Sequence, residues 1–266
     1  MIKKFFAPVA MLCAILFVSS CSSDDDSTAV VADFSLSVSG QAPNATVTIT
    51  NSTTGAVVYG WAFSAGANVS TSLDKDPAAL TVDKAGTFEV TLVATSGSDT
   101  KTVVKTVEIE GNSAIVTYTD VAFAREAGSS TYGRFFSTQT GLIYKDSEVN
   151  STTGPKIDLA FSQLGTSVNY FTSPDDANEK FGIAGATTTK VINYPEGLGV
   201  TPTVFDNATD ESFIKNVAID ASDEESFGTS NPYIILFETA SGKKGAIKTT
   251  AINGERLLVN IKVQKY

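Results

Sequence analysis

The chain has 266 residues, a formal net charge of −10 and no histidine. This length is enough for two ordinary domains, and an acidic chain without a basic run argues against nucleic acid as a partner. The lack of histidine excludes Ser-His-Asp and Cys-His catalytic sites and removes a main ligand of zinc, copper and haem iron. The composition therefore predicts a protein that is not an enzyme and that holds no metal and no cofactor.

Residues 1–20 are typical of a secretory signal. Two lysines precede an apolar run, Phe5–Val18, which is too short to cross a bilayer, and two serines stand directly before Cys21. A cysteine in this position resembles a bacterial lipobox, and the resemblance implies that Cys21 becomes the first residue and carries a lipid. The alternative is an ordinary secretory signal in which the cysteine is incidental.

The acidic stretch Ser22–Asp26 resembles the export signal of Bacteroidota surface lipoproteins. This resemblance implies a lipid-anchored protein of the outer membrane that faces the cell exterior, with the lipid on Cys21 as its contact with the membrane. A plain solvated tether is the alternative for these acids. We expect residues 21–31 to form a flexible tether, because serine, threonine and aspartate dominate them without a pattern.

Residues 32–111 are predicted to form a β-sandwich. Apolar residues recur at every second position in Ala45–Thr50, Phe88–Ala94 and Val103–Ile109, which is typical of half-buried antiparallel strands. Turn residues separate such segments at the spacing of a small sandwich domain.

Two segments within 32–111, Tyr59–Phe63 and Ala85–Leu92, resemble the marker strands of the PKD domain, an immunoglobulin-like sandwich. The resemblance implies a spacer or adhesion module without catalysis. Trp61 is predicted to lie in the core, although a sugar platform is the alternative, and Gly86 to allow a tight turn into its strand. Ser64–Gly66 stands where the family has an acidic turn, so no loop function is implied.

Residues 112–266 are predicted to form a second β-rich domain with a few short helices, which makes the whole chain all-β. Its end predicts a three-stranded meander over Tyr233–Thr239, Ala246–Ile252 and Leu257–Val263, with Asn253–Gly254 as a type I′ hairpin turn. Two segments, Ile157–Phe161 and Phe237–Lys248, faintly resemble haemophore-like surface lipoproteins of Bacteroidota. Only architecture is implied, because the histidine or methionine that would hold iron is missing after Cys21.

Three acidic clusters in this region have the pattern of helix starts. They are Ser173–Asp176, Thr209–Ile214 and Ser222–Glu225, and we expect their acids to cap short helices. A structural calcium ion in one loop is the alternative, although none of the clusters has EF-hand spacing. A carboxylate pair for glycoside hydrolysis is a third and weaker interpretation.

Aromatic residues supply the candidate ligand contacts. We expect Tyr132, Tyr170 and Tyr194 to bind a ligand, because tyrosine stacks on a sugar ring while its hydroxyl stays in water. Arg134 and Asn169 are predicted polar neighbours. Three phenylalanines are instead assigned to the core: Phe135, Phe136 and Phe171.

The sequence therefore predicts a lipid-anchored surface binding protein, in which a PKD-like spacer presents a β-rich domain to a glycan or another extracellular ligand. The alternative is a structural or adhesion protein that contacts a protein partner or matrix. A carboxylate-based hydrolase is the least favoured.

Overall fold

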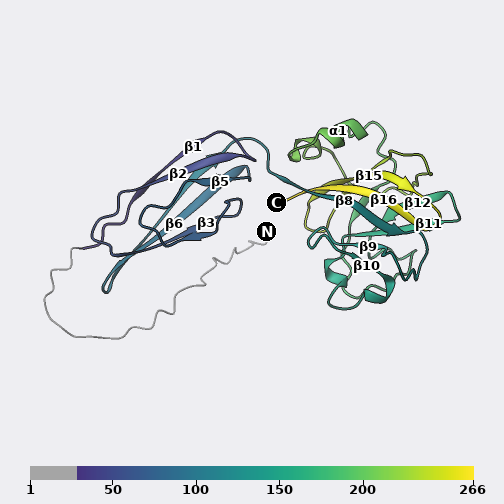
Figure 1. Cartoon of the computed structure of the whole chain (residues 1–266), viewed down its shortest axis with the longest axis horizontal. Helices are drawn as coiled ribbons and strands as arrows, with labels where there is room; N and C mark the ends of the chain where they lie inside the picture. The colour runs from purple at the N-terminus through teal and green to yellow at the C-terminus, as the bar shows by residue number, and fades with distance from the viewer. Residues whose placement is uncertain (1–28) are drawn as a thin grey trace.

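The structure is a computed structural model that describes residues 29–266. The predicted signal and Cys21 lie outside the described residues, as does the tether up to residue 28. Figure 1 shows two β-rich units, one formed by the strands up to Ile109 and one by the strands from Ile115 on, which meet where the chain passes between them. Four antiparallel sheets and few short helices confirm the predicted all-β class. No helix within residues 29–266 is long and apolar enough to span a membrane.

The first unit is a sandwich of a three-stranded sheet, in the order β1-β2-β5, and a four-stranded sheet, in the order β4-β3-β6-β7. This division of the strands is that of an immunoglobulin-like sandwich. The strands are β1 (Phe34–Ser39), β2 (Ala45–Asn51), β3 (Val58–Phe63), β4 (Thr71–Ser72), β5 (Leu80–Val82), β6 (Gly86–Ser96) and β7 (Asp99–Ile109).

Alternate residues of the facing strands fill the core of this sandwich. Trp61 on β3 is 2% exposed, its ring packs edge-on against Phe34, and its indole N–H donates to the Asp74 carbonyl at 2.9 Å. The prediction that Trp61 belongs to the core is therefore confirmed. Gly86 begins β6 with a φ of +99°, a conformation that favours glycine, as expected for a tight turn into the strand.

The first unit begins earlier than the predicted end of the tether at residue 31. Val30 is only 2% exposed, and Val31 exchanges two backbone hydrogen bonds with Thr54. Both valines therefore belong to the folded unit. The free energy gained by burying the Val30 side chain outweighs the conformational entropy lost when this short segment is ordered.

The second unit is also built on two facing sheets, a five-stranded one in the order β13-β14-β15-β16-β8 and a four-stranded one in the order β10-β9-β11-β12. The five-stranded sheet contains β8 (Ile115–Ala124), β13 (Lys190–Ile192), β14 (Ile234–Glu238), β15 (Lys244–Ile252) and β16 (Arg256–Gln264). The other contains β9 (Phe135–Phe136), β10 (Ile143–Tyr144), β11 (Leu159–Leu164) and β12 (Val168–Thr172). The predicted terminal meander is confirmed as β14, β15 and β16.

Both faces of the central strands are buried. On β14, Ile235 and Phe237 enter the core between the two sheets, whereas Ile234 and Leu236 enter a second cluster on the outer face. That outer cluster is covered by α1 (Pro202–Asn207) and by the 3₁₀ turn η3 (Glu211–Phe213). Further 3₁₀ turns, η1 (Asp146–Glu148) and η2 (Gly154–Lys156), lie beyond the four-stranded sheet. Two-sided burial explains why the β14 segment is apolar at successive positions.

Several local predictions for this unit were wrong. Residues 173–181 form turns and residues 222–225 are irregular, so neither acidic cluster starts a helix. The prediction for the remaining cluster, Thr209–Ile214, held in part, because Asp210 caps the 3₁₀ turn η3 by accepting the Ser212 N–H at 2.8 Å. The missed helix, α1, has Thr201 as its N-cap and proline in its first turn.

The hairpin between β15 and β16 is present, but its turn is not type I′. Neither Asn253 nor Gly254 has a positive φ, which a type I′ turn requires at both central residues. Instead the Asn253 side chain accepts the N–H groups of Glu255 and Arg256, both at 2.9 Å. This side-chain bonding is a common property of asparagine in turns.

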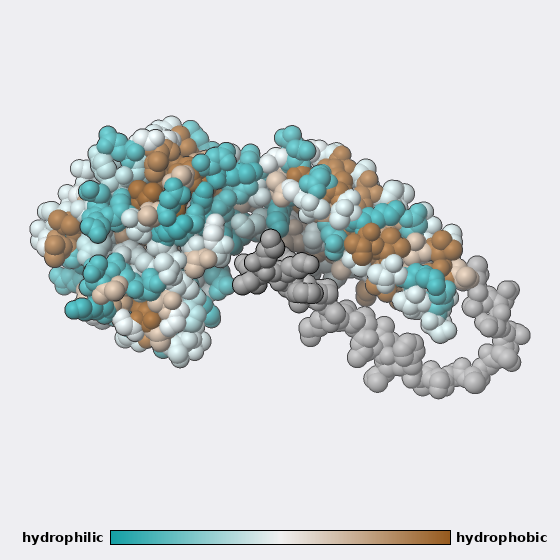
Figure 2. Space-filling view, turned by 180° about the vertical axis from the view of Figure 1, so that it is seen from behind, coloured by the Kyte–Doolittle hydropathy of each residue, from teal (hydrophilic) through white to brown (hydrophobic). Residues whose placement is uncertain are grey.

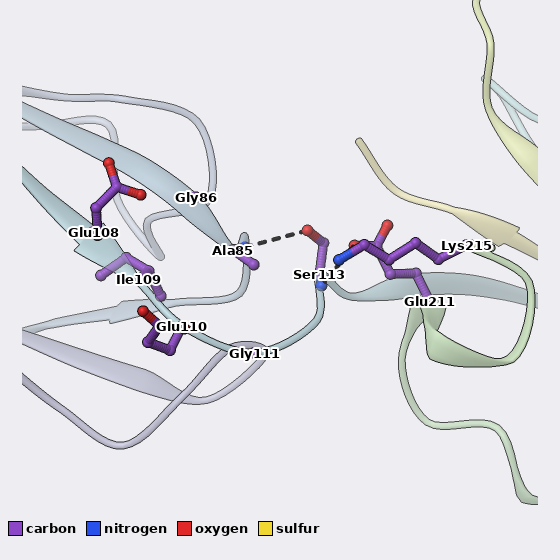
Figure 3. A pocket seen from close by; sticks show the side chains of 9 residues that line it. All are labelled: Ala85, Gly86, Glu108, Ile109, Glu110, Gly111, Ser113, Glu211 and Lys215. Atoms are coloured by element: carbon purple, nitrogen blue, oxygen red, sulfur yellow. Dashed lines mark hydrogen bonds and ion pairs between the residues drawn. The ribbon is translucent and has the colours of Figure 1, made fainter.

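The connection between the units is tied by polar contacts on both sides (Figure 3). Ser113 accepts the Ala85 N–H through its hydroxyl at 3.2 Å and donates its own N–H to the buried Glu211 carboxylate at 3.1 Å. On the same seam the Lys265 ammonium lies 2.6 Å from one carboxylate oxygen of Asp83, and the other oxygen accepts a hydrogen bond from the hydroxyl of Tyr266. The end of the second unit is thereby bound to the first.

Candidate functional site

A cleft of about 340 Å³ opens in the second unit where β13 ends beside the start of β14. Antiparallel pairing matches Lys190 with Glu238 and Ile192 with Leu236, so the residues just beyond β13 come to lie beside the start of β14. This register brings together Tyr194 and Tyr233, which are far apart in the sequence. The lining residues, here called the tyrosine cleft, are Tyr194, Pro195, Glu196, Gly197, Gly199, Val200, Thr201, Pro202, Pro232, Tyr233 and Ile234.

Tyr233 forms the fixed side of the cleft. Its half-buried ring stacks on Phe227 with centroids 5.4 Å apart and planes at 22°, and Phe227 stacks in turn on Phe171 at 6.2 Å and 17°. The Tyr233 N–H donates to the Thr249 hydroxyl at 2.8 Å. A ring at the end of a stack that reaches into the core presents its outer face at little cost in side-chain entropy.

Tyr194 forms the open side of the cleft, with 51% of its surface exposed. Its backbone is held by Asp223, whose two carboxylate oxygens accept the N–H groups of Asn193 at 2.9 Å and Tyr194 at 2.8 Å. Asn193 is itself buried and donates to the Phe171 carbonyl at 2.9 Å. Asp223, predicted to cap a helix, therefore fixes the loop that carries the exposed tyrosine.

Helix α1 supports the third wall. Thr201 and Pro202 line the cleft at the start of this helix. At its other end the Lys262 ammonium donates to the carbonyls of Phe205 at 2.7 Å and Ala208 at 2.8 Å. A cation suits the negative end of a helix, and burial lowers the pKa of Lys262.

Acidic side chains act on the hydroxyls of both tyrosines. The Glu196 carboxylate raises the pKa of Tyr194 through a hydrogen bond and its charge, and Glu225 adds to this effect. Burial is the main cause that raises the pKa of Tyr233, followed by the charge of the ionised form of Tyr194 and then by that of Asp223. Both hydroxyls therefore stay protonated at neutral pH and can donate hydrogen bonds.

The other predicted ligand residues are engaged in contacts within the protein. The Tyr132 hydroxyl accepts a hydrogen bond from Arg256 at 3.1 Å, and the Arg256 guanidinium lies over the Tyr132 ring. Tyr170 donates to Glu179 at 2.5 Å, and burial, followed by this hydrogen bond, raises its pKa. Among residues 29–266, no hydrogen bond or ring contact joins any two of Tyr132, Tyr170 and Tyr194.

Arg134 is held by Asp146. Its Nε and Nη2 donate to the two carboxylate oxygens at 3.0 and 2.8 Å, and its guanidinium lies over the rings of Phe135 and Phe181. Burial works against the charged form of Asp146, but Arg134 and the Gly128 N–H outweigh it and lower the pKa of this carboxyl.

Asn169, the other predicted polar neighbour, is fully buried and donates to the Gly228 carbonyl at 3.2 Å. The three phenylalanines assigned to the core are at most 3% exposed, as predicted: Phe135, Phe136 and Phe171. Within residues 29–266, no group of three or more acidic, cysteine or histidine side chains is placed to hold a metal ion.

A second cleft, of about 330 Å³, lies at the connection between the units (Figure 3). Glu211 and Lys215 approach it from the second unit, and Glu108 and Glu110 from the first. Glu211 already accepts from Ser113 and from the Gln264 amide at 2.8 Å, so its oxygens serve the junction. The tyrosine cleft is the better candidate for a ligand, because its two rings present apolar faces as well as hydroxyls.

No family model and no curated protein matches the chain. Among solved structures, it is similar to the crystal structure of a DUF4466 family protein from Parabacteroides merdae ATCC 43184. The two are 12% identical with a TM-score of 0.45, and the match covers 90% of this chain and 99% of that chain. A likeness at this level assigns no function.

Proposed function

We propose that this protein is a lipid-anchored, cell-surface binding protein whose tyrosine cleft takes a glycan without turnover. The observation that carries the proposal is the pair of tyrosines in one cleft, with Tyr233 fixed on a stack of aromatic rings and Tyr194 open to solvent. Apolar ring faces suit the C–H faces of a sugar, while the hydroxyls and Glu196 offer hydrogen bonds to its OH groups.

The first unit would act as a PKD-like spacer between the anchor and the binding unit. Its two-sheet sandwich and buried Trp61 suit a structural module. The contacts of Ser113 with Glu211 and of Asp83 with Lys265 would hold the second unit at a set orientation to this spacer. Such a spacer would keep the cleft away from the membrane surface.

Binding is tested by substitutions in the cleft. Tyr194→Ala and Tyr233→Ala should each lower glycan affinity at least about tenfold, which is about 1.4 kcal/mol, because each removes a stacking face. Tyr194→Phe should have a mild effect, because it keeps the ring. The ligand is first identified on a glycan array, and affinities are then measured by isothermal titration calorimetry.

Tyr132→Ala and Tyr170→Ala are the matched controls, since both tyrosines lie outside the cleft lining. Binding that survives the cleft substitutions and fails in these controls would place the site elsewhere. If no glycan binds at all, the proposal fails, and capture of a protein or matrix partner would instead support an adhesion role.

Anchoring is tested at Cys21. Cys21→Ala should abolish metabolic labelling with a fatty acid and move the protein from the membrane to the soluble fraction. The control is Cys13→Ala, which lies in the apolar run and should leave both readouts unchanged. Membrane retention of unlabelled Cys21→Ala protein would contradict the lipoprotein proposal.

A further inference from the structure

The lining of the tyrosine cleft has a carboxylate but no lysine or arginine. Glu196 is exposed on the loop that follows Tyr194, and it is the only charged residue of the lining. Two more carboxylates act on the tyrosines: Asp223 accepts the Tyr194 N–H at 2.8 Å, and the charge of Glu225 raises the pKa of both hydroxyls. A ligand that enters the cleft therefore meets Glu196 in the lining and two further carboxylates near the tyrosines.

These three charges have no cationic partner. Among residues 29–266, no ion pair involves Glu196, Asp223 or Glu225. The lysine on the strand that leads to the cleft, Lys190, is paired with Glu238 at 3.0 Å, and Lys248 on β15 is paired with Asp206. The field at the mouth of the cleft is consequently negative.

The sign of this field acts on charged sugars. An anion placed near unpaired carboxylates is repelled over a Debye length of about 8–10 Å at physiological salt. An ammonium group is attracted by the same carboxylates, and it is also attracted by the negative face of a tyrosine ring. Neutral sugars, which bind through stacking and hydroxyl hydrogen bonds, are nearly indifferent to the field.

We infer, on the basis of the proposed glycan-binding function, that the tyrosine cleft selects its ligand by charge: it takes neutral or amine-bearing saccharides and rejects those that carry carboxylate or sulfate groups. Stacking on Tyr194 and Tyr233 supplies the affinity, and Glu196 with its two neighbouring carboxylates supplies the selection. On the face drawn in Figure 2, the apolar patches of both units are broken up by hydrophilic surface.

The test compares saccharides that share a backbone and differ in charge. For β-1,4-linked glucose these are cellohexaose, the chitosan hexamer and the hexamer of glucuronic acid, and any other backbone found on the array is treated in the same way. The neutral and amine-bearing forms should bind at least about tenfold more tightly than the anionic form at low salt. This ratio of affinities, here called the gap, should narrow as salt rises to about 0.5 M, because salt screens exposed charges.

The variant that isolates the charge is Glu196→Gln with Glu225→Gln, which keeps both side chains at nearly constant size. It should narrow the gap at least about threefold. The gap is the ratio of the neutral and anionic affinities of the same variant, so an effect common to both saccharides cancels. The control, Glu126→Gln with Glu255→Gln, makes the same change in net charge at exposed residues of the second unit outside the lining, and should leave the gap as it is.

The outcomes separate the two proposals. An anionic saccharide that binds as tightly as its neutral form, with binding lost in Tyr194→Ala, would overturn the charge selection and keep the glycan site. A gap of the same size in the Glu196/Glu225 variant would also overturn it. If no saccharide binds, the glycan-binding function itself falls and the selection with it. If binding survives Tyr194→Ala, the site lies outside the tyrosine cleft, and the charge selection by this cleft falls.

Discussion

Trp61→Ala should lower the free energy of unfolding of the first unit by about 3–5 kcal/mol, as truncation of a buried aromatic side chain does. The ring is 2% exposed, and the substitution also leaves the Asp74 carbonyl without the indole donor. Urea unfolding followed by far-ultraviolet circular dichroism measures the effect, since the variant has no tryptophan left to report by fluorescence.

The matched control is Val58→Ala on the same strand. Its side chain is 51% exposed, so the change should stay within about 0.5 kcal/mol. Trp61→Phe should lie between the two, because it keeps most of the ring and loses the hydrogen bond. A Trp61→Ala variant as stable as Val58→Ala would contradict the placement of this ring in the core.

Gly245→Ala should destabilise the second unit by at least about 2 kcal/mol, because it overpacks a filled core. A methyl group at this position would lie 2.3 Å from the ring of Phe237 and 2.7 Å from the Lys262 carbonyl. Phe237 is fully buried and pairs directly with Gly245 across β14 and β15, so neither neighbour is free to move aside. Urea unfolding of the second unit measures the loss.

Two companion variants make this prediction specific. Gly254→Ala in the adjoining turn should be neutral, since nothing lies within 4 Å of the added group and φ is not positive there. Adding Phe237→Leu to Gly245→Ala should cost less than the sum of the single changes, because the smaller side chain relieves the clash. Strict additivity would show that the ring is not what excludes the methyl group.

Alternation of apolar and polar residues predicted the strands well, because this pattern is a local property of each short segment. Ala45–Thr50 and Phe88–Ala94 fall within β2 and β6, and the last three predicted strands coincide with β14, β15 and β16. Helix capping patterns did less well. Serine followed by acids, as at Ser173 and Ser222, can satisfy turn N–H groups as readily as a helix, and only the tertiary packing decides between them.

The candidate site was only half predictable. Tyr194 stands among glycine and proline residues, a pattern typical of loops, and its ring is exposed in the structure. Tyr233 was assigned to a strand, because its neighbours are apolar and β-branched. No local pattern brings positions 194 and 233 together, because the pairing of β13 with β14 does so. The register between two distant strands cannot be predicted from either segment alone.

The pairing of β8 with β16 has a consequence for the order in which the chain folds. These neighbours in one sheet begin with Ile115 opposite Gln264, whereas every strand of the first unit finds its partners within residues 34–109. During synthesis all strands of the sandwich around Trp61 are available before β16, the partner of β8, has been made. Until β16 is synthesised, the edges of β8 and β15 that it will pair with are exposed to solvent. Pairing β8 with β16 closes a loop that contains most of the second unit, and we expect this long-range step to be slow.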